Sequence, residues 1–336
     1  MTDNTAPKKS IHEFADKDGQ FRRQVSSFRS RVSADPNAEF PAEADRYVLY
    51  ITLGCPWAHR ANLVRSLKGL EDIIQLVVMD YTLTEEGWVY TGVDGTAPCD
   101  PLYGFTRHKD LYLKADPSFV GRYTVPVLWD KKRETIVNNE SSEIIRMFFT
   151  AFDHLLPPER RESAHGFGGY YPEGPLRGQI DELNDWVYNT VNNGVYKTGF
   201  ASTQEAYENH LYPLFASLDR LEALLKDSAE GGKGPFLFGN HITEADIRLY
   251  TTIARFDVGY FTLFKCNLKM IRYEYPHLDK WYRRLYWDDT ALTRGAFKKT
   301  TNFDHIIKGY AAALKHKTYP RGPIPYILPA PVEEEY

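Results

Sequence analysis

Residues 46–67 constrain the fold of this chain more than any other segment. An apolar run at residues 47–53, rich in β-branched and aromatic side chains, leads through Gly54 into Cys55. The following residues place alanine, valine and leucine at the spacing of one helical face. Pro56 suits the first position of a helix, where its missing N–H is not needed. The segment therefore predicts a buried strand that turns directly into a helix, with Cys55 at the turn.

This position favours a reactive thiolate at Cys55. The free amides and the positive dipole end of a helix N-terminus lower the pKa of a cysteine from its usual value of about 8.5. His59 and Arg60 are candidates for further positive charge nearby. The alternative is a buried, inert core thiol, but a Cys-Pro pair between a strand and a helix is the attacking position of thioredoxin-like folds. We therefore interpret Cys55 as a nucleophile.

The site has one thiol rather than two. Thioredoxin-like redox motifs carry a second cysteine three residues after the first, and here that position is Ala58. A mixed disulfide on Cys55 must then be opened by a thiol from outside the protein. Glutathione is the obvious cellular candidate.

The composition limits the class of protein. A chain of 336 residues with 43% hydrophobic and 14% aromatic residues is long and apolar enough for two globular domains. Its formal net charge of −4 argues against general nucleic-acid or anionic-membrane binding, so we expect a small-molecule partner. The N-terminus lacks a signal-peptide core and no segment approaches a membrane span of roughly 20 apolar residues. Three scattered cysteines, Cys55, Cys99 and Cys266, fit a reducing compartment, so we predict a soluble cytoplasmic protein without a metal.

The chain divides into five regions. Residues 1–45 are polar and predict an extended arm, whose basic cluster we interpret as a solvated face: Arg22, Arg23, Arg29 and Arg31. Residues 46–154 predict a thioredoxin-like domain, and residues 155–178 form a linker dense in proline and glycine. Residues 179–314 have helical periodicity, with Thr243 and Asp246 as a capping box that we assign to folding. Residues 315–336 are a proline-rich tail.

Within the first domain, residues 73–80 predict a second strand parallel to the first, with a right-handed crossover. Residues 81–122 predict a long excursion without regular structure, in which Trp88 is either a loop anchor or a functional residue. Val125-Pro126 before the strand at residues 127–129 predicts a cis peptide that turns the Val125 backbone toward the cysteine. Residues 136–137 return antiparallel. Glu140 and Ser141 then open a helix at residues 142–152, as an ordinary cap or a carboxylate-binding site.

Three of these motifs together resemble the cytosolic glutathione transferases: CPWAHR at Cys55, TVPVLWD around Pro126 and NNESSEI around Glu140. Three further segments are similar to the S-glutathionyl-hydroquinone reductases, the Xi class of that superfamily, which is related to the omega class. They are GVYKTGFA from Gly194, TEADIRLYTTIARFD from Thr243 and TNFDHIIKGY from Thr301. The resemblance spans roughly residues 46–310 and implies an α/β thioredoxin-like N-terminal domain, an all-α C-terminal domain and a homodimer.

The resemblance also implies which residues form the active site. Cys55 is then the nucleophile, and Tyr196, Tyr260 and Tyr310 correspond to the family's phenolic site residues. Glutathione is the co-substrate and no metal is involved. The residues implied to hold glutathione are Trp88, Arg122, Tyr123, Thr124, Val125, Pro126, Glu140 and Ser141.

The resemblance leads to one principal hypothesis and two alternatives. The principal hypothesis is glutathione-dependent reduction of S-glutathionyl-hydroquinones through a mixed disulfide on Cys55, with Tyr196 as proton donor. The second is a general omega-type thiol transferase or dehydroascorbate reductase, which uses the same first step. The third is a non-catalytic, transferase-like binding module, which the intact nucleophile argues against.

Overall fold

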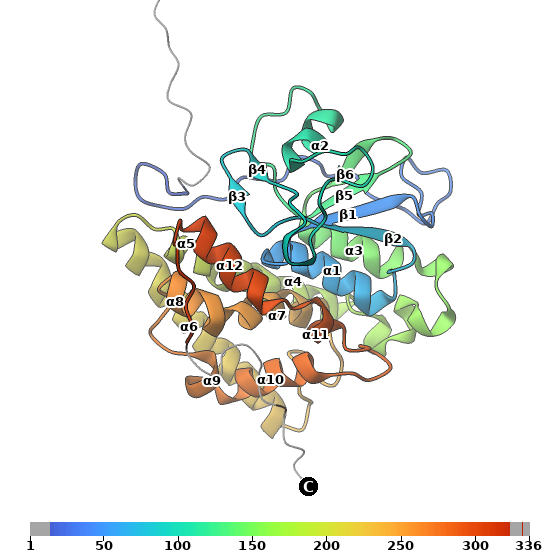
Figure 1. Cartoon of the computed structure of the whole chain (residues 1–336). Helices are drawn as coiled ribbons and strands as arrows, with labels where there is room; N and C mark the ends of the chain where they lie inside the picture. The colour runs from blue at the N-terminus through green and yellow to red at the C-terminus, as the bar shows by residue number, and fades with distance from the viewer. Residues whose placement is uncertain (1–13, 323–330, 332–336) are drawn as a thin grey trace, which may run out of the picture.

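The computed structural model describes residues 14–322 and residue 331. Its N-terminal domain is a four-stranded sheet of order β2-β1-β5-β6. Strand β1 (Tyr47–Ile51) pairs parallel with β2 (Ile74–Val78) and antiparallel with β5 (Val127–Asp130), which pairs antiparallel with β6 (Thr135–Asn138). Helices α1 (Pro56–Lys68) and α3 (Ser141–Thr150) pack together below the sheet in Figure 1, and α2 (His108–Ala115) lies above it. This is the α/β thioredoxin-like plan predicted for the first domain.

The turn from β1 into α1 forms as the sequence predicts. Every residue of β1 is buried, because the strand lies between two neighbouring strands and packs against helix α1. The Cys55 amide donates to the Thr52 carbonyl at 3.3 Å, Pro56 is the first helical residue, and Cys55 is the N-cap. The helix ends at Gly69, which adopts the left-handed conformation with φ of 74°.

The excursion at residues 81–122 is more regular than predicted. It contains the hairpin β3 (Leu83–Thr84) and β4 (Gly87–Trp88), the 3-10 turn η1 (Val93–Gly95) and helix α2. The prediction of an irregular loop was wrong because α2 buries only His108, Leu111 and Tyr112, too few residues to show a helical period. Asp94 anchors the excursion to the C-terminal domain, where it pairs with Lys308 at 2.8 Å.

The segment between the domains is packed rather than free. It forms the 3-10 turns η2 (Asp153–Leu155), η3 (Pro158–Arg160), η4 (Glu162–Ala164) and η5 (Gly166–Gly168). Lys68, fully buried at the end of α1, pairs with Asp153 at 2.9 Å and Glu162 at 3.4 Å. Glu162 also accepts a hydrogen bond from the Tyr170 amide at 2.6 Å.

The second domain is built from helices joined by loops. Its elements are α4 (Pro175–Val187), η6 (Tyr188–Asn192), α5 (Gly194–Gly199), α6 (Gln204–Glu230), α7 (Glu244–Arg255), η7 (Phe256–Tyr260), α8 (Phe261–Leu263), α9 (Ile271–Glu274), α10 (Pro276–Trp287), α11 (Ala296–Thr300) and α12 (Phe303–Ala313). Helix α12 lies beside the first domain in Figure 1. The predicted capping box is present at α7, and Asp246 also accepts from the Trp281 indole at 2.9 Å. Asp246 thus has a folding role.

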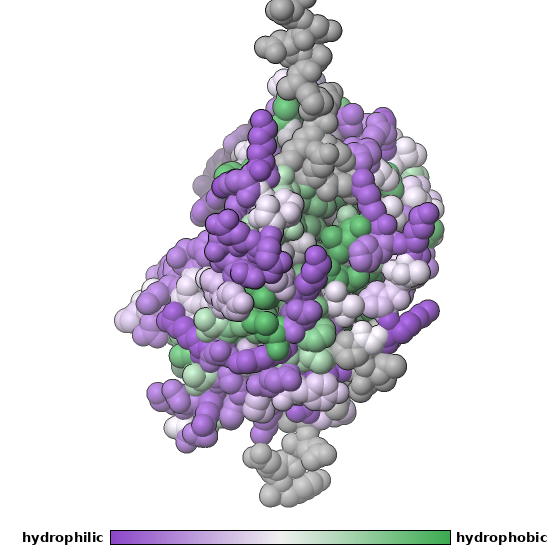
Figure 2. Space-filling view, turned by 90° about the vertical axis from the view of Figure 1, so that its left-hand side faces the viewer, coloured by the Kyte–Doolittle hydropathy of each residue, from purple (hydrophilic) through white to green (hydrophobic). Residues whose placement is uncertain are grey.

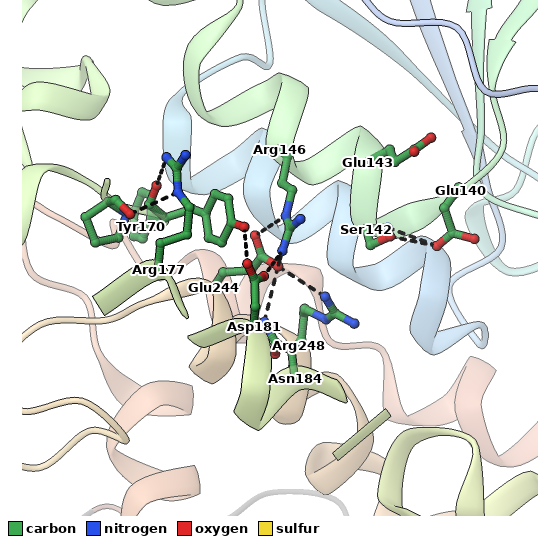
Figure 3. Close-up of polar contacts among 12 residues, drawn as sticks. Glu140, Ser142, Glu143, Arg146, Tyr170, Arg177, Asp181, Asn184, Glu244 and Arg248 are labelled. Atoms are coloured by element: carbon green, nitrogen blue, oxygen red, sulfur yellow. Dashed lines mark hydrogen bonds and ion pairs between the residues drawn. The ribbon is translucent and has the colours of Figure 1, made fainter. Parts of the chain in front are cut away.

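A buried carboxylate joins the two domains. Glu244, at the start of α7, is fully buried and accepts two hydrogen bonds at 2.9 Å from Arg146 of α3. Arg248 and Asn184 donate to the same carboxylate at 3.1 and 3.3 Å (Figure 3). Because a buried charge is costly without partners, this cluster fixes the position of α3 against α7 and α4.

Among the described residues, no helix combines the length and the apolar character that a membrane crossing requires. Within the predicted tail, residues 323–330 and 332–336 lie outside the described residues, as do the first thirteen residues of the predicted arm.

Candidate active site

Cys55 faces the loop that precedes β5. Its side chain is half-buried, and Sγ lies 3.7 Å from the Val125 carbonyl oxygen. The peptide bond between Val125 and Pro126 is cis, as the sequence predicts. The thiol at the end of one strand and the backbone at the start of another therefore meet at one edge of the sheet.

The environment of the thiol has opposing effects on its ionisation. Burial raises the pKa of Cys55 above its usual value, while the Ala58 and Trp57 amides and the charges of Arg255 and Arg23 lower that pKa. The helix terminus thus acts in the predicted direction, but burial outweighs it. The local sequence does not reveal the extent of this burial, because the burial of a turn residue depends on the second domain.

His59 and Arg60 do not supply the predicted charge. His59 is buried, with Nδ1 2.9 Å from an Arg255 nitrogen and Nε2 2.9 Å from the Thr300 hydroxyl. Burial and the Arg255 charge hold the pKa of His59 well below its usual range, so the ring is neutral. Arg60 turns toward the helical domain, where it donates to Asn192 at 2.8 Å. The expectation that these two side chains assist the thiolate was wrong.

Arg255, at the end of α7, is the cation that sequence reasoning missed. Its fully buried guanidinium donates to the carbonyls of Leu53 at 3.1 Å and Gly54 at 3.0 Å, and to Thr251 at 2.7 Å. A side chain of the C-terminal domain thereby holds the two residues that precede Cys55. The one sequence signal was an arginine at the end of a largely apolar helix.

A cavity of about 150 Å³ opens at the Cys55 sulfur, between the two domains. Its lining brings together five of the predicted site residues, which are Cys55, Trp88, Arg122, Tyr196 and Tyr310. The rest of the lining is largely apolar and includes Phe14, Phe21, Trp57 and Phe200. Figure 2 shows the side of the molecule that carries the β3–β4 hairpin, where apolar side chains gather toward the middle among hydrophilic ones.

The three predicted tyrosines form one chain of hydroxyl groups. The Tyr310 hydroxyl is 2.8 Å from that of Tyr196 and 2.7 Å from that of Tyr260. Burial raises the pKa of Tyr196 to about 12, and nearby Cys55 adds to the increase. Burial also raises the pKa values of Tyr260 and Tyr310, so all three phenols are protonated at neutral pH. Tyr260 is fully buried behind Tyr310 and lies outside the described cavity lining.

The remaining predicted residues follow the edge of the sheet toward α3. The Thr124 carbonyl accepts from the Tyr112 hydroxyl at 2.9 Å, and the Tyr123 ring packs 5.6 Å from that of Tyr112. Glu140 caps α3 by accepting from the Ser142 amide at 3.2 Å, and Ser141 is the buried first residue of that helix.

Glu140 lies apart from the cavity at the thiol. It lines a second cavity, of about 260 Å³, together with Arg60, Asp181 and Arg248. Figure 3 shows Glu140 and Ser142 at the N-terminus of α3, beside the interdomain cluster. The predicted site residues are therefore grouped in two places, joined by the Val125 loop.

The N-terminal arm crosses the site. Gln24 accepts from the Arg122 amide at 2.9 Å, and the Ser26 hydroxyl donates to Glu140 at 3.0 Å. The Arg23 guanidinium lies 4.6 Å from the Trp57 ring centre and 4.9 Å from that of Tyr196. The interpretation of the basic cluster as a solvated face is therefore wrong for Arg23. A polar segment without periodicity contains no signal that could have placed it there.

No group of three or more histidine, cysteine or acidic side chains suited to a metal ion occurs within the described part of the chain. The polar groups of the site are instead one thiol, hydroxyl groups, guanidinium groups and backbone amides. This set suits thiol chemistry on an anionic peptide-like ligand.

Models of known protein families match both halves of the chain. The model for the glutathione S-transferase N-terminal domain matches residues 54–150, and that for the C-terminal domain matches residues 204–284. The fold is thus that of a glutathione transferase.

Individual relatives show which class of glutathione transferase the chain resembles. Glutathione S-transferase omega-like 2 of Schizosaccharomyces pombe is 49% identical, covering 94% of this chain and 97% of the relative. Glutathionyl-hydroquinone reductase YqjG of Escherichia coli is 46% identical, covering 89% of this chain and 86% of the relative. The crystal structure of the glutathione S-transferase Xi from Phanerochaete chrysosporium has a TM-score of 0.84 at 51% identity, covering 94% and 96% of the two chains. This chain belongs to the Xi class of the glutathione transferase family.

Proposed function

We propose that this protein reduces S-glutathionyl-hydroquinones to hydroquinones, with glutathione as co-substrate. Two relatives support this reaction by name, YqjG and the glutathionyl-hydroquinone reductase PcpF of Sphingobium chlorophenolicum, at 46% and 44% identity. YqjG also has a glutathione-bound structure, which matches this chain with a TM-score of 0.78. The observation that carries the proposal is the cavity that contains both the Cys55 thiol and the hydroxyl-bearing Tyr196 and Tyr310.

The first step is attack of the Cys55 thiolate on the sulfur of the glutathionyl thioether. The new Cys55–glutathione disulfide forms as the bond between sulfur and the aryl carbon breaks, and that carbon leaves with the electron pair. The carbon must gain one proton to give the hydroquinone, so the two sulfur atoms are oxidised and the ring is reduced. A protonated phenol beside the ring is a suitable donor.

Tyr196 is the proposed donor, because it lines the cavity at Cys55 and is protonated. The Tyr310 hydroxyl, 2.8 Å away, can replace the lost proton, and Tyr260 in turn supports Tyr310. The proton thus moves toward the substrate, from Tyr310 to Tyr196 and from Tyr196 to the ring carbon. We assign the fully buried Tyr260 to the support of this relay rather than to contact with the quinol.

The second step is attack of a glutathione thiolate on the mixed disulfide. This releases oxidised glutathione and restores the Cys55 thiolate, so the proton and electron balance closes with one added glutathione. We propose that the Val125 backbone pairs with the cysteinyl part of glutathione, while Glu140 and Ser141 bind the γ-glutamyl ammonium and carboxylate. The residues proposed to complete this site are Trp88, Arg122, Tyr123, Thr124 and Pro126.

We further propose a cytoplasmic homodimer. The three cysteines, Cys55, Cys99 and Cys266, are all free thiols, as a reducing compartment favours. Sedimentation of a monomer at micromolar concentration would remove the dimer from this proposal.

The deciding assay compares two substrates of the wild-type protein. Release of menadiol from glutathionyl-menadiol, together with formation of oxidised glutathione, is the expected result. Turnover of a glutathionyl-disulfide alone, with glutathionyl-menadiol left intact, would favour a general thiol transferase instead.

A further inference from the structure

Among the described residues of the N-terminal arm, Arg23 is the one cation in the wall of the Cys55 cavity. Its guanidinium packs between the faces of Trp57 and Tyr196, at 4.6 and 4.9 Å, with Phe21 at 5.3 Å. Its Nε donates to Asn193 at 2.9 Å, just ahead of α5. The group is thus oriented by aromatic surfaces and one hydrogen bond, and no carboxylate pairs with it in the described part of the chain.

The Nη2 atom of Arg23 is buried and has no hydrogen-bond partner among the described residues. A guanidinium carries five N–H donors, and a buried donor without an acceptor is energetically unfavourable. An unused cationic donor in the wall of a ligand cavity is available to an atom of a bound ligand. The complement of such a donor is an oxygen atom with negative or partly negative charge.

The position of Arg23 distinguishes between two sources of that oxygen, the glutathione carboxylates and the quinol ring. The residues proposed for the glutathione ends are Glu140 and Ser141 at α3, and Arg122 near Trp88. Arg23 instead lies against Tyr196, on the side of the cavity formed by the helical domain. A glutathionyl sulfur at Cys55 would direct its aryl substituent toward this aromatic side.

We propose that Arg23 binds a ring oxygen of the quinol and so is a specificity-determining residue for the aryl half of the substrate. This inference rests on the proposed hydroquinone reductase function. A hydroxyl oxygen on the ring gains electron density when the carbon–sulfur bond breaks, so a fixed cationic donor binds it more strongly in the transition state.

The arm is held firmly enough to present Arg23 in one orientation. The Gly19 carbonyl accepts from the Ser202 amide at 3.2 Å, and Gln20 pairs with His210 of α6 at 2.5 Å. On the other side of Arg23, Gln24 and Ser26 bond to the Arg122 amide and to Glu140. Anchors on both sides leave the guanidinium little freedom, as a positioning role requires.

The test compares Arg23→Met with two further variants. Arg23→Lys keeps the charge with different donor geometry, and Arg22→Met is the matched control. Arg22 is the adjacent arginine, its side chain is 60% exposed, and it pairs with Asp16 and Asp18 away from the cavity. Each protein is assayed with glutathionyl-menadiol and with the mixed disulfide of glutathione and 2-mercaptoethanol, which has no ring.

Both substrates require attack of the same thiolate on a glutathionyl sulfur, so the ratio of their kcat/KM values cancels effects on Cys55 and on glutathione binding. We expect this ratio to fall about 10-fold or more in Arg23→Met, which is the worth of one charged hydrogen bond. It should fall less in Arg23→Lys and stay at the wild-type value in Arg22→Met.

An unchanged ratio in Arg23→Met would overturn the inference, whether both activities stay at the wild-type value or both fall equally. A wild-type protein that leaves glutathionyl-menadiol intact would instead overturn the proposed function itself. The wild-type and variant results therefore distinguish the two failures.

Discussion

The Arg255→Met substitution tests how the second domain prepares Cys55. It removes the hydrogen bonds that Leu53 and Gly54 carbonyls accept from a fully buried cation. Bonds from a charged donor contribute about 1.5–3 kcal/mol each. Because methionine refills part of the space, we expect a net loss of roughly 3–4 kcal/mol in the free energy of unfolding. With an unfolding entropy of about 2.1 cal/mol/K per residue, a chain of 336 residues should then show a fall in Tm of roughly 4–6 °C.

The same substitution should weaken the thiolate. The Arg255 charge lowers the pKa of Cys55 against the effect of burial, so its removal raises that pKa further. The assay is the rate of Cys55 alkylation by iodoacetamide as a function of pH, read by mass spectrometry. The midpoint should move to higher pH in Arg255→Met and stay near the wild-type value in Arg255→Lys, which keeps the charge. An unchanged midpoint in Arg255→Met would refute the assigned role.

Four further substitutions test other parts of the site. Tyr196→Phe should lower hydroquinone reduction about 10²-fold, the usual worth of a general acid, whereas Tyr260→Phe, set behind Tyr310, should cost less; full activity in Tyr196→Phe would move the acid role elsewhere. Burial lowers the pKa of His108 to about 4, so between pH 6.5 and pH 4 the unfolded chain binds more protons than the folded protein. The free energy of unfolding should therefore fall by roughly 3 kcal/mol as the pH decreases through that window. His108→Gln should flatten this fall in urea titrations; an equal slope would contradict it. Gly54→Ala places a Cβ 3.0 Å from the His305 carbonyl oxygen, so we expect the variant to lose about 1–3 kcal/mol in the free energy of unfolding and to have a lower Tm. A Tm equal to that of the wild type would contradict this expectation.

Local patterns explain the part of the fold that was predictable. The strand, the Cys-Pro turn and helix α1 follow from residue types within some twenty positions of the chain. The same is true of the capping box at Thr243 and Asp246. In these segments the side chain that forms an element and the groups that stabilise it are neighbours in sequence, so periodicity and capping rules suffice.

The rest of the site depends on contacts between distant segments. Arg255 reaches the Leu53 and Gly54 carbonyls from about 200 residues away, and Arg23 reaches Tyr196 from the arm. Neither contact leaves a periodic pattern. Burial of Cys55 likewise results from the packing of two domains, and it reverses the predicted direction of the thiol pKa. Helix α2 was missed because it is short and buries few apolar residues.

The most direct test of the account is a single turnover without free glutathione. Wild-type protein is mixed with glutathionyl-menadiol, and both the released menadiol and the intact protein mass are measured. We predict one menadiol released per active site and a protein heavier by one glutathionyl group, mapped to Cys55, with neither change in Cys55→Ala. Release of menadiol without the adduct, or an adduct at Cys99 or Cys266 instead, would contradict a mechanism that proceeds through Cys55.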